Sequence, residues 1–243
     1  EAAAEGILTT DTRSKGATRT LTIDGETVNI AGISKGSGMI QPNMATMLGF
    51  VATDAAISQQ RLEAMLREGV SRSFNCITVD SDTSTSDTVL LCATGKGAKH
   101  KKIVSLGDRH LRDFREKLDG LMRDLAQQIV RDGEGASKLV TLHISGAASE
   151  KAARRIGLSV ANSPLVKTAI AGGDANWGRM VMAVGKAGEK ADRDLLSISM
   201  GGIAITRKGK IVSGYNEKPV AAHLKDREIM LEIDVGVGKG CAT

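Results

Sequence analysis

The chain has 243 residues, of which 41% are hydrophobic, 25% are charged and only 2% are aromatic. This balance is typical of folded proteins, and at roughly 150 residues per domain the length allows one large domain or two small ones. The net charge of +5 permits nucleic-acid binding, but single-strand binders stack bases on aromatic side chains, which are scarce here. No run of 18 apolar residues occurs, and the N-terminus lacks the basic segment and apolar run of a secretory signal. We therefore predict neither a membrane span nor a membrane partner.

Cysteine and histidine are few and scattered. The three cysteines, Cys76, Cys92 and Cys241, form no CxxC pair, which favours a reducing compartment. None of the four histidines lies three or four residues from another, so the sequence offers no helix-borne pair of metal ligands. We therefore predict no metal site.

Alternating apolar and β-branched residues predict a first half of the chain that is rich in strands. Asp24-Gly25 is a typical two-residue turn, and the alternation on both sides of it predicts a hairpin. A glycine-rich loop is expected at 32–38 and a hydroxyl-rich loop at 80–87. The predicted strands of this half are 7–12, 18–23, 27–30, 46–53, 77–79 and 88–92.

Apolar residues at helical spacing predict one helix from Ser58 to Ser71 and a longer one from Asp108 to about Arg131. Strands and helices come in runs rather than in strict alternation. This order favours an α+β layered sandwich over a doubly wound parallel sheet. The second half is expected to contain helices at 149–156, 163–171, 177–184 and 219–225, and strands at 138–145, 195–200, 203–206 and 228–235.

Lys35 lies in the glycine-rich loop, the first stretch that could carry chemistry. The spacing GxxxxGK[ST] is missing and Pro42 follows soon after, so neither a P-loop nor a dinucleotide-binding loop is predicted. Small residues around Lys35 would let the backbone approach a ligand closely. On these residues alone, a plain turn is the simpler interpretation.

Two acidic stretches are also candidates for a site. Asp80, Asp82 and Asp87 lack the glycine and glutamate that an EF-hand calcium loop needs at its sixth and twelfth positions. A polar network that closes the loop is therefore the favoured interpretation. Glu134 stands between two glycines at the end of a predicted helix, where a negative charge is unfavourable for the helix dipole. That cost suggests that Glu134 has another task.

The most specific motif of the chain is KGSGMIQPNMATML at 35–48. It is accompanied by LTTDT at 8–12, ATDA at 52–55, ITVD and DTST within 77–85, IVRDGEG at 129–135, and DANWGR at 174–179. In this order, over nearly the whole chain, the motifs resemble the ornithine acetyltransferase family of arginine biosynthesis. Its members are also called bifunctional glutamate N-acetyltransferase/amino-acid acetyltransferase.

The resemblance implies a precursor that cuts itself, in the manner of N-terminal-nucleophile enzymes, between Ala45 and Thr46. Residues 1–45 would then be the C-terminal part of an α-chain, and residues 46–243 a nearly complete β-chain. The freed Thr46 would be the nucleophile, because its own α-amine can serve as the base that a threonine hydroxyl needs. The implied fold is an α+β, layered α/β/β/α-type sandwich.

The implied reaction is a ping-pong transfer of acetyl from N2-acetylornithine to glutamate through an acetyl-threonine ester, without metal or nucleotide. Thr12, Lys35, Thr46 and Glu134 would line the substrate site. We expect Lys35 to meet a substrate carboxylate and Glu134 to meet the ornithine ammonium. No cofactor is implied, although bifunctional members also take acetyl-CoA as a co-substrate. The implied assembly is a cytoplasmic heterotetramer of two α- and two β-chains without a nucleic-acid partner.

The sequence departs from the family pattern in three places. Ser86 stands where asparagine is expected, which we interpret as a loop adjustment. The family's Thr-Gly oxyanion-hole pair precedes the match to Thr12, and a tail with a substrate-binding Asn and Thr follows the match to Thr243; neither is in this sequence. We therefore expect about the last two-thirds of a longer precursor, unable to catalyse alone. Two alternatives stay open: a related self-cleaving aminopeptidase and a basic polyanion-binding module.

Overall fold

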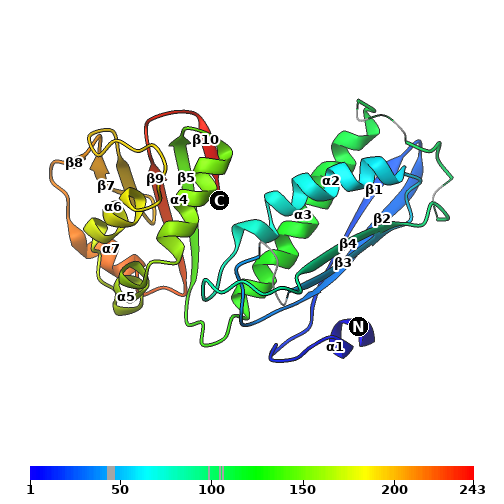
Figure 1. The fold of residues 1–243 in the computed structure, drawn as a ribbon, viewed down its shortest axis with the longest axis horizontal. Helices are drawn as coiled ribbons and strands as arrows, with labels where there is room; N and C mark the ends of the chain where they lie inside the picture. The colour runs from blue at the N-terminus through cyan, green and yellow to red at the C-terminus, as the bar shows by residue number, and fades with distance from the viewer. Residues whose placement is uncertain (43–46, 98, 104, 106) are drawn as a thin grey trace. The chain divides into compact units, whose positions relative to one another are not determined.

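In a computed structural model, the chain forms two compact units, Glu1–Ala136 and Ser137–Thr243, each with its own hydrophobic core (Figure 1). Among the described helices, none combines the length and the apolar character that crossing a membrane requires. The residues that the structure describes are 1–42, 47–97, 99–103, 105 and 107–243.

The first unit is built on a four-stranded sheet with the strand order β1-β2-β3-β4. β1 (Lys15–Ile23) pairs antiparallel with β2 (Glu26–Lys35), which pairs antiparallel with β3 (Leu48–Thr53). β4 (Thr88–Ala93) runs parallel to β3. Because Lys15 lies opposite Ser34, the segment before β1 and the turn after β2 meet at one end of the sheet.

The hairpin between β1 and β2 is confirmed, and its turn has the expected chemistry. Asp24 and Gly25 both have positive φ, 52° and 82°. Two consecutive residues of this kind form a turn whose twist matches that of the strands it connects. Ile23 lies opposite Glu26, so the turn consists of the two predicted residues alone.

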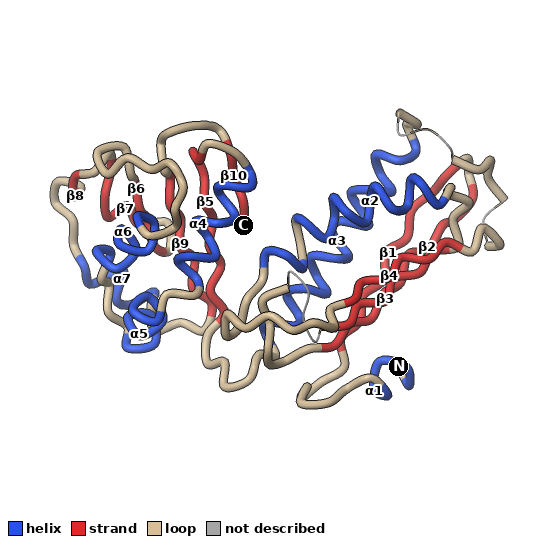
Figure 2. Tube along the Cα trace, in the orientation of Figure 1, coloured by secondary structure: helices blue, strands red, loops and turns tan. Residues whose placement is uncertain are grey.

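Two helices, α2 (Gln59–Ser71) and α3 (His110–Arg131), cover one face of this sheet (Figures 1 and 2). A 3-10 helix, η1 (Phe74–Cys76), follows α2, and the short α1 (Ala2–Gly6) opens the chain. The apolar stripe predicted for the long helix is confirmed, since its residues form much of the core: Leu111, Phe114, Leu118, Leu121, Met122, Leu125 and Ile129.

The other face of the first sheet is partly exposed. Ile33, Phe50 and Leu90 line a shallow cavity of about 560 Å³ on it, and Leu90 is 48% exposed. Side chains alternate between the two faces of a strand, so these positions point away from the core under α2 and α3. Among the described residues, α2 and α3 therefore cover one face of the first sheet, and the opposite face is partly exposed.

The second unit is a six-stranded sheet with the order β10-β5-β9-β6-β7-β8, in which only β5 and β9 are parallel neighbours. Its strands are β5 (Leu139–Ala147), β6 (Ser197–Met200), β7 (Ile203–Arg207), β8 (Lys210–Ile211), β9 (Glu228–Asp234) and β10 (Gly240–Ala242). Its helices are α4 (Glu150–Ala161), α5 (Pro164–Gly172), α6 (Trp177–Gly185) and α7 (Glu217–His223). α4 packs on β5 and β10, and α6 packs against α4 (Figure 2).

Several predicted elements are wrong in type or length. Residues 7–12 form no strand, because the N–H groups of Thr9 and Thr12 donate to carboxylates instead of to a neighbouring strand. Residues 77–79 form no strand either; Val79 N–H donates to the carbonyl of Ile40 without a continuing ladder. The expected loop at 32–38 begins later, since residues 32–35 belong to β2. The helix predicted at 149–156 is longer, because α4 continues to residue 161. No strand is predicted where β10 lies.

Candidate active site

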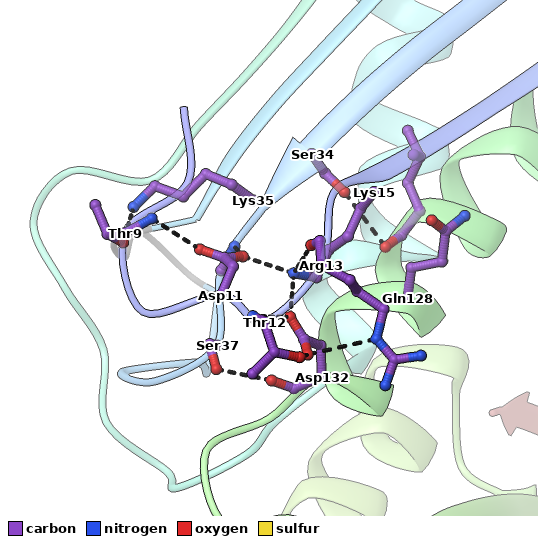
Figure 3. Close-up of polar contacts among 12 residues, drawn as sticks. Thr9, Asp11, Thr12, Arg13, Lys15, Ser34, Lys35, Ser37, Gln128 and Asp132 are labelled. Carbon is purple, nitrogen blue, oxygen red and sulfur yellow. Dashed lines mark hydrogen bonds and ion pairs between the residues drawn. The ribbon is translucent and has the colours of Figure 1, made fainter. Parts of the chain in front are cut away.

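Three of the predicted substrate-binding residues, Thr12, Lys35 and Glu134, lie in the first unit and are connected through one hydrogen-bonded cluster. Figure 3 shows the part of this cluster around Thr12 and Lys35. The fourth, Thr46, lies outside the described residues, as does Ala45 on the other side of the predicted cleavage bond. The catalytic and substrate-binding roles of Thr12, Lys35, Thr46 and Glu134 and the cleavage between Ala45 and Thr46 stay predictions.

Thr12 lies in the loop between α1 and β1 and is held by Asp132, the residue that follows α3. Its N–H donates to Oδ2 of Asp132 at 3.0 Å, and its hydroxyl donates to Oδ1. Both polar groups of Thr12 are thus bound to one carboxylate 120 positions away in the sequence. The loop before β1 is thereby attached to the end of α3.

Lys15 is the cation at the centre of the cluster (Figure 3). Its side chain is fully buried, and its Nζ lies 2.6 Å from Oδ1 of Asp11 and 2.7 Å from Oδ2 of Asp132. Burial by itself would raise the pKa of Asp132, but hydrogen bonds from Lys15 and Thr12 outweigh it and lower that pKa to about 2. Asp132 is therefore an ionised acceptor at neutral pH.

Asp11 connects the same cluster to the turn after β2. Its carboxylate accepts hydrogen bonds from the N–H groups of Gly36, at 2.6 Å, and of Thr9, at 3.3 Å. Burial opposes ionisation of Asp11, but its bonds with Lys15 and with these N–H groups outweigh burial and lower its pKa. Gly36 has a φ of 148°, a conformation that side-chain-bearing residues rarely adopt.

Lys35 is the last residue of β2 and is only 6% exposed. Among the described residues, its ammonium has one hydrogen-bond partner, the hydroxyl of Thr9 at 3.0 Å, and no carboxylate within ion-pair distance. A buried ammonium with one neutral partner is incompletely compensated. The site therefore favours an anionic group, such as a carboxylate, next to Lys35.

Glu134 follows α3 and lies over the glycine-rich turn. Its N–H donates to the carbonyl of Ser37 at 3.0 Å, and the hydroxyl of Ser37 donates to the carbonyl of Asp132 at 2.7 Å. A Cβ added to Gly38 would lie 2.7 Å from the Glu134 carboxyl group. The absence of a side chain at Gly38 is thus what allows Glu134 its exposed position beside the turn.

The acidic loop at 80–87 holds the segments on both sides of residues 43–46. The carboxylate of Asp80 accepts from the N–H groups of Met39 at 2.7 Å and Ile40 at 3.0 Å. Asp87 accepts from the N–H of Met47 at 2.6 Å. These contacts support the interpretation of the loop as a closing network.

Sequence reasoning does not single out Asp11, Lys15 or Asp132, although these residues hold the site together. One signal for Lys15 exists in the sequence. It shares its strand face with Leu21 and Ile23, which point into the core, so period-two alternation directs Lys15 inward as well. A buried lysine needs a carboxylate partner, but alternation does not tell which carboxylate it is.

Comparisons with known proteins identify the family to which the chain belongs. The ArgJ family model matches residues 1–243. The chain belongs to the ArgJ family. A relative from Zymomonas mobilis named "Arginine biosynthesis bifunctional protein ArgJ" is 55% identical over 239 residues, which are 98% of this chain and 58% of the relative. A relative of the same name from Ruegeria pomeroyi is 54% identical over 243 residues, which are 100% of this chain and 58% of the relative.

A solved structure from this family shares the fold. The crystal structure of arginine biosynthesis bifunctional protein argJ from Bacillus halodurans is similar to this chain with a TM-score of 0.75 and 34% identity, over 79% of this chain and 90% of that chain. This likeness confirms the predicted α+β fold class. The chain spans about 58% of the length of the curated relatives that it matches.

Proposed function

We propose that the protein carrying this chain transfers the acetyl group of N2-acetylornithine to glutamate, as a glutamate N-acetyltransferase of arginine biosynthesis. The observation that carries the proposal is the ArgJ family match over residues 1–243. Because the relatives are named as bifunctional proteins, acetyl-CoA is proposed as a second acetyl donor. The working assembly is a cytoplasmic heterotetramer of two α- and two β-chains.

The charges of the first unit support this substrate class. The buried ammonium of Lys35 lacks an anionic partner among the described residues, and an amino-acid carboxylate would supply one. Glu134 is exposed and ionisable, and it suits the side-chain ammonium of ornithine. A substrate with a carboxylate at one end and an ammonium at the other matches this pair.

In the proposed cycle, cleavage between Ala45 and Thr46 first frees the α-amine of Thr46. With an ordinary pKa of about 7.7–8.0, this amine can take the proton from the Thr46 hydroxyl. Oγ1 attacks the acetyl carbonyl, the amide C–N bond breaks, and ornithine leaves with the proton. The α-amine of glutamate then attacks the ester, and N-acetylglutamate leaves as Oγ1 regains its proton. The steps need no cofactor.

Intact mass spectrometry of the full-length protein tests the cleavage. We expect two chains from the wild type and one from Thr46→Ala. Thr22→Ala, an exposed threonine of β1, serves as the control and is expected to give two chains. A single uncut chain from the wild type would contradict the proposed activation.

An acetyl-transfer assay tests the reaction itself. N-acetylglutamate should form from N2-acetylornithine only when glutamate is present; release of acetate alone would indicate the aminopeptidase alternative. Lys35→Ala should raise KM for N2-acetylornithine, because the carboxylate loses its cation. Lys102→Ala, at an exposed lysine, is the control. An unchanged KM in Lys35→Ala would contradict the role of Lys35.

A further inference from the structure

Lys15 and Asp132 carry out no step of the proposed reaction, yet their side chains are 0% and 2% exposed. An ion pair this deeply buried is weak evidence for added stability, because both charges lose their water and an apolar pair of similar volume is often as stable. The hydrogen bonds around the Lys15–Asp132 pair indicate a more specific role for the two residues.

Asp132 determines how Thr12 can interact with a ligand. The carboxylate accepts from both the hydroxyl and the N–H of Thr12. Because the hydroxyl proton of Thr12 is directed toward the carboxylate, the Thr12 oxygen presents only lone pairs to its surroundings. Thr12 is thereby prepared to accept a hydrogen bond from a ligand and not to donate one.

Lys15 is also connected, through Asp11, to the backbone beside Lys35. Asp11, the second partner of Lys15, accepts from the N–H of Gly36, the residue that follows Lys35. On the other side, the carbonyl of Asp132 accepts from the Ser37 hydroxyl. One buried lysine thus connects the loop of Thr12 with the turn that follows Lys35.

We infer that Lys15 and Asp132 are positioning residues of the acetyl-transfer site, which orient Thr12 so that its hydroxyl oxygen accepts a hydrogen bond from a substrate N–H group. This inference rests on the proposed function and deepens it. The ligand it specifies carries an amide or ammonium N–H close to a carboxylate. An N-acetylated diamino acid has both groups.

The first unit contains a matched comparison. Arg19 and Asp124 also join β1 to α3, at 3.1 Å, and their side chains are 33% and 41% exposed. This pair shares no hydrogen bond with Thr12, Lys35 or Glu134 among the described residues. Loss of the Arg19–Asp124 pair therefore reports what an ordinary ion pair between the same two elements contributes.

Acetyl transfer by the full-length protein tests the inference. The variants are Asp132→Asn, Thr12→Val, the double variant, and Asp124→Asn as the control, each measured for kcat, KM and urea midpoint. Asp132→Asn should raise KM for N2-acetylornithine about ten-fold or more. The double variant should be no worse than Thr12→Val, because both changes remove one shared interaction. Asp124→Asn should leave KM unchanged.

A purely structural role predicts a different result: a lower urea midpoint with KM unchanged, or effects on KM that add in the double variant. Either result in folded protein overturns the inference. If Asp132→Asn does not fold, the comparison of Thr12→Val with Thr12→Ser tests the inference instead. Both variants are expected to fold, because Thr12 is exposed. Thr12→Val should raise KM about five-fold more than Thr12→Ser, and equal values overturn the inference. A wild type that transfers no acetyl group refutes the proposed function instead.

Discussion

The ammonium nitrogen of Lys15 lies 2.7 Å from Oδ2 of Asp132, across 117 positions of sequence. The contact joins the first residue of β1 to the residue that follows α3. It therefore closes the first unit at the end of the sheet where the candidate site lies. Because both side chains are buried, the protonation of Asp132 is coupled to the stability of this unit.

The coupling predicts a loss of stability in acid. The pKa of Asp132 is lowered from 3.8 to about 2 on folding, so the folded unit favours the ionised form. The resulting stabilisation, about 2 kcal/mol, is complete above about pH 5 and is lost as the pH falls through the folded pKa. Urea midpoints of wild type and Asp132→Asn, measured between pH 7 and pH 2.5, should converge in acid. A gap that does not depend on pH would contradict the prediction.

Gly38 is predicted to be needed for function more than for stability. A Cβ in Gly38→Ala would displace the Glu134 carboxyl group, which is the far end of a flexible, exposed side chain. We expect the free energy of unfolding to change by less than about 0.5 kcal/mol, while KM for N2-acetylornithine rises several-fold.

Gly120→Ala is the matched control. Gly120 lies inside α3, and beyond the adjoining turns of that helix no described atom lies within 4 Å of an added Cβ, so alanine should stabilise the helix by about 0.5–1 kcal/mol. KM should not change in this variant. Equal KM values in Gly38→Ala and Gly120→Ala would show that Glu134 does not meet the substrate.

The local parts of the fold are predictable from the sequence because their causes are local. Asp24-Gly25 permits the two positive φ angles of a tight hairpin turn, and the apolar spacing of α3 directs one stripe into the core. Residues 7–12 have strand-like composition, but the N–H of Thr12 finds its acceptor 120 positions away. A local sequence pattern cannot predict a partner so far along the chain.

The candidate site is predictable only in part, for the same reason. Lys35 and Glu134 stand out through motifs, and the structure connects Glu134 to the turn at Ser37 and Gly38 and Lys35 to Thr9. Lys15 could be assigned to the inner face of its strand by alternation. Its pairing with Asp132, however, depends on where the end of α3 packs against the sheet, which is decided by the whole core.

In the second unit, Lys138 is predicted to stabilise two helices at once. Its ammonium donates to the carbonyl of Ile170 at 3.0 Å, in the last turn of α5, and to the carbonyl of Leu224, just after α7. A cation at a helix C-terminus satisfies carbonyls that the helix leaves unpaired. Lys138→Met should lower the free energy of unfolding of this unit by about 1.5–3 kcal/mol.

The fluorescence of Trp177, the single tryptophan of the chain, reports on that loss, because it packs against the core of the second unit. Lys186→Met is the control. Lys186 follows α6, and its side chain has no hydrogen-bond partner among the described residues. Its replacement should change the free energy of unfolding by less than about 0.5 kcal/mol. If Lys138→Met and Lys186→Met lower the free energy of unfolding equally, the stabilisation comes from the positive charge and not from the hydrogen bonds of Lys138.

Asp80 and Asp87 are predicted to speed the proposed self-cleavage, because they bind the backbone on both sides of residues 43–46. Loss of either carboxylate releases one side of the segment, and small misplacements of reacting groups are costly. Asp80→Ala and Asp87→Ala should each slow cleavage on the order of ten-fold, measured as the uncut fraction over time by intact mass. Asp82→Ala is the control, since among the described residues the Asp82 side chain binds no backbone N–H. Equal cleavage rates in all three variants would show that the loop does not position the bond.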